Sequence, residues 1–409
     1  MQPNDIQQPL ASWHMKIPRV LPERLFTHDK DAALLNHAQF FVLDQMASVS
    51  DPADFWYSYA MPLAHIETPL SYAFCALGAA HRHFLLSGPG DLKGSKDEVL
   101  KSEIITIEKY NAAIAQIQEY SRREHRGIDG YIPLICCVVF ICIEQLLGRY
   151  TESVTHLQSG CCLFRSTVDL PGMSAPGDLK NALLKVFYRL GYDAITIGEC
   201  EVLGYLPCDF PMPDMGSRDQ PFADYDEASK MLGQVDVIHN ASYASPAVVH
   251  VSQPTEGREY LLQEYRALNS AREAFGIWKS RFKLLQQSGI PAPEQEPQAL
   301  FFSLEQSVWA MLSELTTFED PPSIESCQAV LSNTEAVALM YQSEKHPTFS
   351  FGGDLVPTLG LICMSCEDRE TQERSLSVLR LLRRREGIWD SVELAYDCET
   401  LLLTGELPC

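Results

Sequence analysis

The sequence predicts an all-α fold, a large multi-helix domain of packed antiparallel helix pairs. Two observations carry this prediction. Apolar residues recur at spacings of three and four along most of the 409-residue chain, which is the period of one helix face. No segment shows the alternation of a half-buried strand, and no strict internal repeat is visible. With 46% hydrophobic and 21% charged residues, the chain has the composition of a globular protein with a large core.

The most apolar stretch, residues 132–165, predicts a central helix pair. Its first helix carries one apolar face, made by Ile132, Ile135, Cys136, Val139, Phe140, Ile143, Leu146 and Leu147. Gly148 suits the left-handed position that ends such a helix, and Thr151 or Ser153 can begin the next one. Gly160 on that second helix would let a neighbouring helix approach closely. The short connection makes the two helices antiparallel neighbours.

The other elements follow on either side of this pair. Residues 1–30 contain four prolines and predict an extended N-terminal arm. The N-terminal helical half, 31–204, adds helices over residues 32–46, 53–61, 69–87, 95–120 and 178–199. Prolines and glycines predict an irregular connecting segment over 205–257. The C-terminal helical half, 258–409, holds helices over residues 258–287, 298–317, 323–345, 355–366, 369–385 and 389–404.

Charge and cysteine usage limit the classes of function. The net charge of −22 would repel nucleic acid phosphates, so we expect no direct contact with nucleic acid. The longest apolar run, 132–143, is too short to cross a bilayer, and the N-terminus lacks the pattern of a signal peptide. Thirteen cysteines, several on apolar helix faces, are typical of reduced thiols in a nuclear or cytoplasmic protein.

Motifs with known chemistry are scarce. Cys363 and Cys366 form a C-x-x-C pair, but a zinc site needs four ligands and no second pair lies near in the sequence. Gly88, Gly90 and Gly94 lack the spacing of a dinucleotide loop and follow no strand. There is no paired acidic cluster for magnesium and no hydrolase or zinc-protease motif. We therefore expect neither a metal nor a cofactor.

Polar residues within apolar helices are the candidate site residues. Glu144 and His156 lie on the two central helices, where a structural pair is favoured over a pair of catalytic acid–base groups. His81 and Arg82 end the helix over 69–87, where they suit either the helix dipole or the mouth of a pocket. We expect a ligand cavity whose polar lining combines these four residues with Tyr188, Tyr192 and Asp193.

Four segments, in this order, resemble the helical regulatory domain of fungal zinc-cluster transcription factors. They are FWYSYAMPLAHIETPLSYAFCALGAAH (55–81), EKYNAAIAQI (108–117), IEQLLGRY with THLQSG (143–160) and CEDRETQERSLSVLRLLRRREGIWDS (366–391). The likeness spans about residues 50 to 400. One feature departs from the family. Its six-cysteine zinc cluster, which contacts DNA, does not precede this domain, because the first cysteine is Cys75.

The resemblance implies a regulator that lacks its own DNA-binding module and controls a fungal metabolic gene programme, in secondary metabolism, through protein partners in transcription. The alternative is a cofactor-free cyclase or isomerase of secondary metabolism that binds a small hydrophobic metabolite in a helical pocket. Both interpretations place the protein in the nucleus or cytoplasm, away from membranes. A homodimer is compatible with either.

Overall fold

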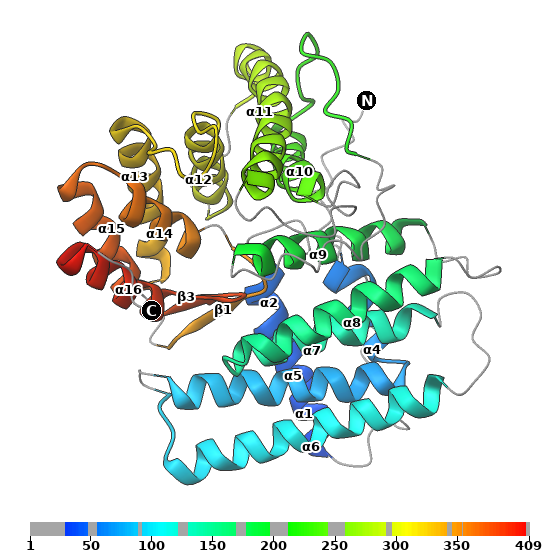
Figure 1. The fold of residues 1–409 in the computed structure, drawn as a ribbon. Coiled ribbons are helices and arrows are strands. Elements are labelled where there is room, and N and C mark those ends of the chain that lie inside the picture. Colours follow the sequence, from blue (N-terminus) through cyan, green and yellow to red (C-terminus); the bar gives the residue numbers. More distant parts are fainter. Residues whose placement is uncertain are drawn as a thin grey trace, which may run out of the picture.

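The computed structural model describes residues 29–47, 55–88, 92–121, 130–168, 177–196, 212–243, 258–291, 297–341, 346–353 and 355–405. Helices dominate these ranges, and one small sheet joins them (Figure 1). The predicted all-α fold of packed helix pairs is confirmed. The predicted N-terminal arm, 1–30, lies outside the described residues except for its last two positions.

The N-terminal half is a layered helical bundle around one continuous core. Its elements are α1 (Asp29–His37), the π-helical turn η1 (Ala38–Val42), α2 (Leu43–Ala47), the π-helical turn η2 (Trp56–Ala60), α4 (Met61–Ala64), α5 (Thr68–Ser87), α6 (Lys96–Ser121), α7 (Ile132–Leu146), α8 (Tyr150–Val168) and α9 (Gly177–Thr196). The central helix α7 is buried almost throughout and packs against α5 and α8. It corresponds to the first helix of the predicted pair, and α8 to the second.

Gly160 shows why the sequence needs a small residue on α8. A Cβ atom added at this position would lie 2.6 Å from the ring of Phe187 on α9. Such a contact is too short for any real side chain, so the glycine allows α9 to pack directly onto α8. At the other end of the pair, Gly148 adopts the predicted left-handed conformation, with φ of +69°.

The C-terminal half begins with α11 (Arg258–Gln287), which packs against α10 (Tyr225–Tyr243) of the connecting segment. Its remaining helices are α12 (Pro297–Leu312), α13 (Ile324–Tyr341), α14 (Leu355–Ser365), α15 (Arg369–Leu382) and α16 (Ser391–Thr404). In Figure 1 these five form a separate group beside the N-terminal bundle. Two further apolar cores lie here, one among α12 to α16 and one between α10, α11 and α12.

Helix α10 corrects the prediction that residues 205–257 are irregular. Ala228, Leu232, Val235 and Ile238 form its buried face. Its start has a reciprocal cap, because Asp224 Oδ1 accepts from the Glu227 amide at 2.7 Å and Glu227 Oε2 accepts from the Ala223 amide at 2.6 Å. Prolines before the helix and β-branched residues within it obscured this signal. The segment is therefore partly helical.

Three short strands form a sheet, and the last two of them along the chain correct the prediction that helices cover 369–385 and 389–404 in full. Strand β1 (Thr348–Ser350) pairs in parallel with β2 (Arg384–Glu386), which pairs antiparallel with β3 (Trp389–Asp390). Arg383 ends α15 in the left-handed conformation, at φ +46°, and Gly387 turns the chain at φ +57°. The charges of RRRE look like a solvated helix end, but the structure buries two of them.

The charged side chains of β2 bind both within the C-terminal half and across to the N-terminal half. Arg384 Nε donates to Glu386 Oε1 at 2.6 Å, and both residues are buried. Glu386 Oε2 also accepts from the amides of Leu355 and Val356, the first amides of α14. Arg385 Nη1 donates to the carbonyl oxygen of Leu146 at 3.1 Å. The arginine thus caps the negative end of α7 from the C-terminal half.

Candidate functional site

A cavity of about 290 Å³ lies where the two halves meet. It is bounded by α9 on one side, α10 and α12 on another, and by α14, β3 and the segment after α12. We call it the interhelix cavity. Its lining residues are Arg189, Tyr192, Asp193, Thr196, Asp236, His239, Asn240, Glu305, Val308, Trp309, Leu312, Phe318, Pro357, Thr358, Leu361, Met364 and Trp389. A mostly apolar lining with a few convergent polar groups is typical of small-molecule sites.

Aromatic rings form much of the wall around His239. The centroid of the His239 ring lies 4.9 Å from that of Tyr192, 5.7 Å from Trp309 and 6.3 Å from Phe318, each in an edge-to-face arrangement. Trp309 Nε1 donates to Asp236 Oδ1 at 3.0 Å, which fixes the indole of α12 against α10. Trp389 of β3 adds a fourth aromatic side chain to the lining.

Helix α9 supplies a pair of opposite charges to the lining of the cavity. Arg189 Nε lies 3.6 Å from Asp193 Oδ1, one helical turn further along. Arg189 Nη2 also donates to the carbonyl oxygen of Gly353 at 2.9 Å, so the guanidinium joins α9 to the segment that precedes α14. Asp193 is buried, with 4% of its surface exposed.

The local sequence explains how these side chains reach one place. On α9, core residues such as Leu183, Phe187 and Leu190 hold one face of the helix inward, and the adjoining face carries the residues that line the cavity. Arg272 of α11 donates from Nε to the carbonyl oxygen of Ser313 at 2.9 Å. This bond fastens the segment after α12, which brings Phe318 to the cavity.

The structure separates the predicted ligand-binding residues. Tyr192 and Asp193 line the interhelix cavity, and with His239 we call them the cavity cluster. Tyr188 lies on the same helix, one turn earlier, but it belongs to the apolar core and is 1% exposed. Arg82 is exposed at the surface of α5. A ligand-binding role for any of these residues stays a prediction.

His81 forms a pair with His37 of α1 instead of joining the cavity. Its Nδ1 lies 3.0 Å from His37 Nε2. Burial lowers the pKa of His81 to about 3, with a smaller contribution from His37 itself. Burial likewise lowers the pKa of His37 to about 4, assisted by the charge of Arg82. Both imidazoles are therefore neutral at pH 7, as buried histidines without a carboxylate partner are expected to be.

Glu144 and His156 do approach each other, through Tyr110 of α6. The Tyr110 hydroxyl lies 2.5 Å from His156 Nε2, and Glu144 Oε1 lies 4.0 Å from the same nitrogen. Burial raises the pKa of Glu144 and lowers that of His156, so both shifts favour the uncharged forms. Phe140 packs on the tyrosine and histidine rings, at 4.6 and 5.4 Å. We call Tyr110, Glu144 and His156 the closed cluster, because none of them lines the interhelix cavity or either of two further cavities, which lie near the end of α5.

Sequence reasoning found only Tyr192 and Asp193 of the interhelix cavity and missed the walls opposite α9. Asp236 and His239 lie on α10, in the segment predicted to be irregular, and Glu305 and Trp309 face them from α12. One signal was available, because Asp224 and Glu227 have the D-x-x-E spacing of a capping box, which predicts a helix. Within that helix, Asp236, His239 and Asn240 fall at spacings of three and four and hence on one face.

Comparisons with known proteins do not assign the chain to a family. No protein-family model matches the chain, and no curated protein or solved structure matches it significantly. Among the described residues, no three His, Cys, Asp or Glu side chains are grouped so that they could hold a metal ion. None of the described helices has both the length and the apolar character that crossing a membrane requires.

Proposed function

We propose that the protein is a ligand-responsive helical effector, which binds a small apolar molecule carrying a positive charge in the interhelix cavity. The single observation that carries the proposal is the composition of the cavity wall, where aromatic rings and carboxylates converge between the two halves. A volume of about 290 Å³ suits a ligand with one ring and a short side chain.

The charges in the lining favour a cation over an anion. Among the described lining residues, three carboxylates, those of Asp193, Asp236 and Glu305, face the cavity together with one guanidinium, that of Arg189. This excess of negative charge attracts an ammonium group and disfavours a carboxylate or phosphate. The aromatic faces can hold a cation as well as an apolar ring, with a cation–π contribution of about 0.5–2 kcal/mol.

The position of the cavity supports an effector role. A ligand there would contact α9 of the N-terminal half and α12, α14 and β3 of the C-terminal half at the same time. Because such a ligand binds one arrangement of the halves better than another, it would shift the population between them. The chain resembles the helical regulatory domain of zinc-cluster transcription factors. This resemblance supports a role in which protein partners in a metabolic gene programme respond to the ligand-induced shift.

The cyclase or isomerase alternative has less support from the geometry. Phe140 packs on the ring of the candidate base, His156, and neither His156 nor the candidate acid, Glu144, lines the interhelix cavity. An acid or base has to reach the proton that it transfers, either directly or through one water molecule. The closed cluster therefore favours a structural role, which matches the interpretation preferred from the sequence.

The direct test is a comparison of three probes that share a phenyl ring on a four-carbon chain and carry a positive, a neutral or a negative terminal group: 4-phenylbutylamine, 4-phenylbutan-1-ol and 4-phenylbutyrate. Saturation-transfer NMR on the full chain at pH 7 would measure their dissociation constants. For ligands of this size we expect a value on the order of 1 mM for the amine, with the alcohol weaker and the acid weakest. The Glu305→Gln variant should weaken the amine about fivefold and leave the alcohol unchanged.

A matched control removes a carboxylate far from the cavity. Glu325 is exposed at the start of α13, so Glu325→Gln should leave all three affinities unchanged. If the acid bound as tightly as the amine, the cationic class of the ligand would be wrong. If none of the three probes bound up to their solubility limits, the cavity would not be a ligand site.

A further inference from the structure

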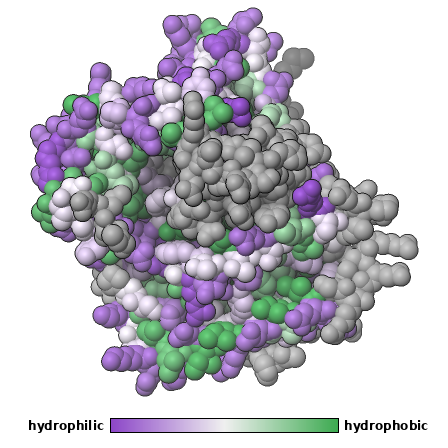
Figure 2. All heavy atoms as spheres, in the orientation of Figure 1, coloured by the Kyte–Doolittle hydropathy of each residue, from purple (hydrophilic) through white to green (hydrophobic). Residues whose placement is uncertain are grey.

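Helix α6 exposes an apolar stripe on the outer face of the N-terminal bundle. Leu100, Ile104 and Ile107 are 56%, 47% and 43% exposed, and their spacings of four and three place them along one line of the helix. Ile105 beside them is 37% exposed. Figure 2 shows hydrophobic residues gathered at the lower edge of the molecule, where Figure 1 places α6. Single exposed aliphatic residues are common on protein surfaces, but a continuous stripe marks an interaction surface.

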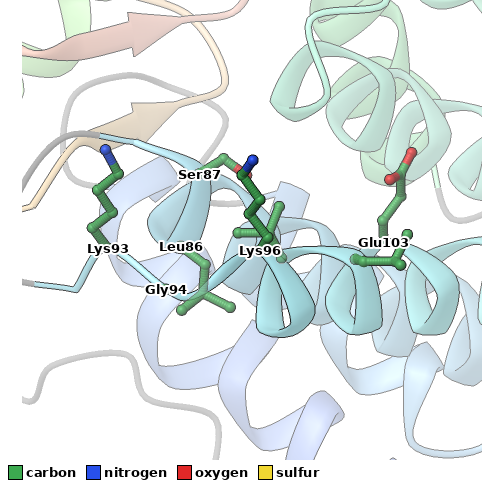
Figure 3. A pocket seen from close by; sticks show the side chains of 8 residues that line it. Leu86, Ser87, Lys93, Gly94, Lys96 and Glu103 are labelled. Atoms are coloured by element: carbon green, nitrogen blue, oxygen red, sulfur yellow. The ribbon is translucent and has the colours of Figure 1, made fainter.

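An open cavity of about 320 Å³ extends this surface beyond Leu100 to the end of α5. Leu86, Val99 and Leu100 form its apolar part. In Figure 3 the side chains of Lys93, Lys96 and Glu103, which line this cavity, all point toward the top of the view. The region therefore offers an apolar strip with charged edges, which is the pattern of a helix that packs against another helix.

We propose that the stripe of α6 is a self-association surface, on which a second copy of this chain packs its own α6 in the antiparallel direction. Leu100, Ile104, Ile107 and Asn111 take the positions that face the partner in a heptad pattern, with alternating steps of four, three and four. In a two-fold symmetric pair, Ile104 of each copy then lies at the level of Ile107 of the other.

Charge complementarity selects a second copy as the occupant. Lys101 and Glu108 each follow a stripe residue directly, so they lie on the same flank of the stripe. In the antiparallel arrangement, that flank faces the same flank of the partner. Along the helix axis, Lys101 of one copy and Glu108 of the other are then offset by two residues, which is about 3 Å. The two-fold axis creates this ion pair twice.

Both side chains are available for this contact. Neither Lys101 nor Glu108 forms an ion pair within the described part of the chain, whereas other charges of α6 are already used. Lys109 pairs with Asp31 at 2.6 Å, and Glu103 lies 3.6 Å from Arg149. The flank of α6 that carries Lys101 and Glu108 therefore has charges that are not used in ion pairs within one copy. The same flank of a second, antiparallel copy offers the opposite charges.

Sedimentation velocity of the full chain between 1 and 100 µM tests the proposal. We expect a concentration-dependent dimer, and Ile104→Glu should raise its dissociation constant about a hundredfold, because a charge would be buried twice. Lys101→Glu and Glu108→Lys should each raise it about tenfold through like-charge contacts. The double variant Lys101→Glu/Glu108→Lys should restore wild-type association, because the swap recreates both pairs.

The control places the same charge on another exposed apolar residue. Leu403 on α16 is 76% exposed, and Leu403→Glu should leave the dimer unchanged. Circular dichroism would verify that each variant is folded. A wild-type chain that stays monomeric at 100 µM would overturn the proposal, as would a dimer that Ile104→Glu does not weaken. Failure of the double variant to recover association would overturn the antiparallel register.

Discussion

The closed cluster and the cavity cluster contain the same three kinds of side chain, a tyrosine, a carboxylate and a histidine, in different surroundings. In the closed cluster, Phe140 covers the histidine and tyrosine rings, and the cluster lies between α6, α7 and α8. In the cavity cluster, the histidine lies among rings that leave about 290 Å³ of space at the boundary of the two halves. Residue types alone therefore do not distinguish a structural network from a binding site.

What separates the two clusters is the packing around them. Where neighbouring side chains fill the space around a polar group, the group belongs to the core, because a substitution there creates a void or an unpaired hydrogen-bond donor. Space that remains open lets the same groups contact a ligand. The comparison predicts that mutations in the closed cluster lower the stability of the protein, whereas mutations at the cavity change binding with a smaller effect on stability.

The largest expected effect comes from Phe140→Ala. Phe140 is 4% exposed and covers the closed cluster from α7. Its removal should lower the free energy of unfolding by about 3–5 kcal/mol, through lost burial and the void left behind. Urea denaturation followed by circular dichroism measures the change. Phe40→Ala serves as the control, because Phe40 is 63% exposed and its loss should cost less than about 0.5 kcal/mol. An unchanged denaturation midpoint for Phe140→Ala would show that the cluster is not closed.

Acid should destabilise the protein through the neutral histidine pair. The pKa of His81 falls from its ordinary 6.5 to about 3 in the folded protein, so the unfolded chain binds more protons below pH 6.5. The stability that this histidine contributes is complete above pH 6.5 and decreases as the pH falls toward the folded value. The expected slope is about 1.4 kcal/mol per pH unit.

The variant His81→Gln isolates this contribution. Denaturation between pH 7 and pH 5 should show a shallower pH dependence for the variant than for the wild type, whatever its stability at pH 7. The lowered pKa of His156 acts in the same direction, and the raised pKa of Glu144 acts in the opposite one. Parallel curves for the two proteins would contradict the assignment of His81 as a buried neutral group.

Tyr110→Phe should have a smaller effect, because it removes one hydroxyl and keeps the packed ring. His156 Nε2 would lose its contact at 2.5 Å with the tyrosine hydroxyl. The expected loss is about 1–2 kcal/mol, since the imidazole stays half-buried without that partner. Tyr396→Phe is the matched control at a site that is 65% exposed. Equal effects of the two substitutions would mean that the Tyr110 hydroxyl makes no stabilising contact with His156.

Most helices could be predicted because their apolar residues repeat with the helical period. The α7–α8 pair illustrates this, down to Gly148 and Gly160. The sheet could not be predicted, because Arg384 and Glu386 are buried only by pairing with each other and with the start of α14. A sequence shows the charges of such a pair, but the partner that lies 30 residues away is visible only in the fold.

The candidate site could be predicted only in part for a related reason. Tyr192 and Asp193 were accessible to sequence reasoning because they interrupt an apolar helix. The opposite wall depends on where α10 and α12 pack, and no local pattern specifies that. The same reasoning grouped His81 and Glu144 with the cavity, because a buried polar residue looks alike in sequence whether it faces a void or a neighbour.

The smallest expected effect on stability is that of Trp389→Phe, which also tests whether a ligand contacts β3. Trp389 is half-buried on β3 and lines the cavity, so a smaller ring should cost less than about 1 kcal/mol. Binding of 4-phenylbutylamine should change the tryptophan emission excited at 295 nm, because the probe itself does not absorb there. The variant should lose a substantial part of that change. Trp278→Phe should retain it, because Trp278 is buried between α10 and α11, where its Nε1 donates to Ala228. A full response from Trp389→Phe would place the ligand away from β3 and nearer to Trp309 of α12, the other tryptophan in the described lining of the cavity.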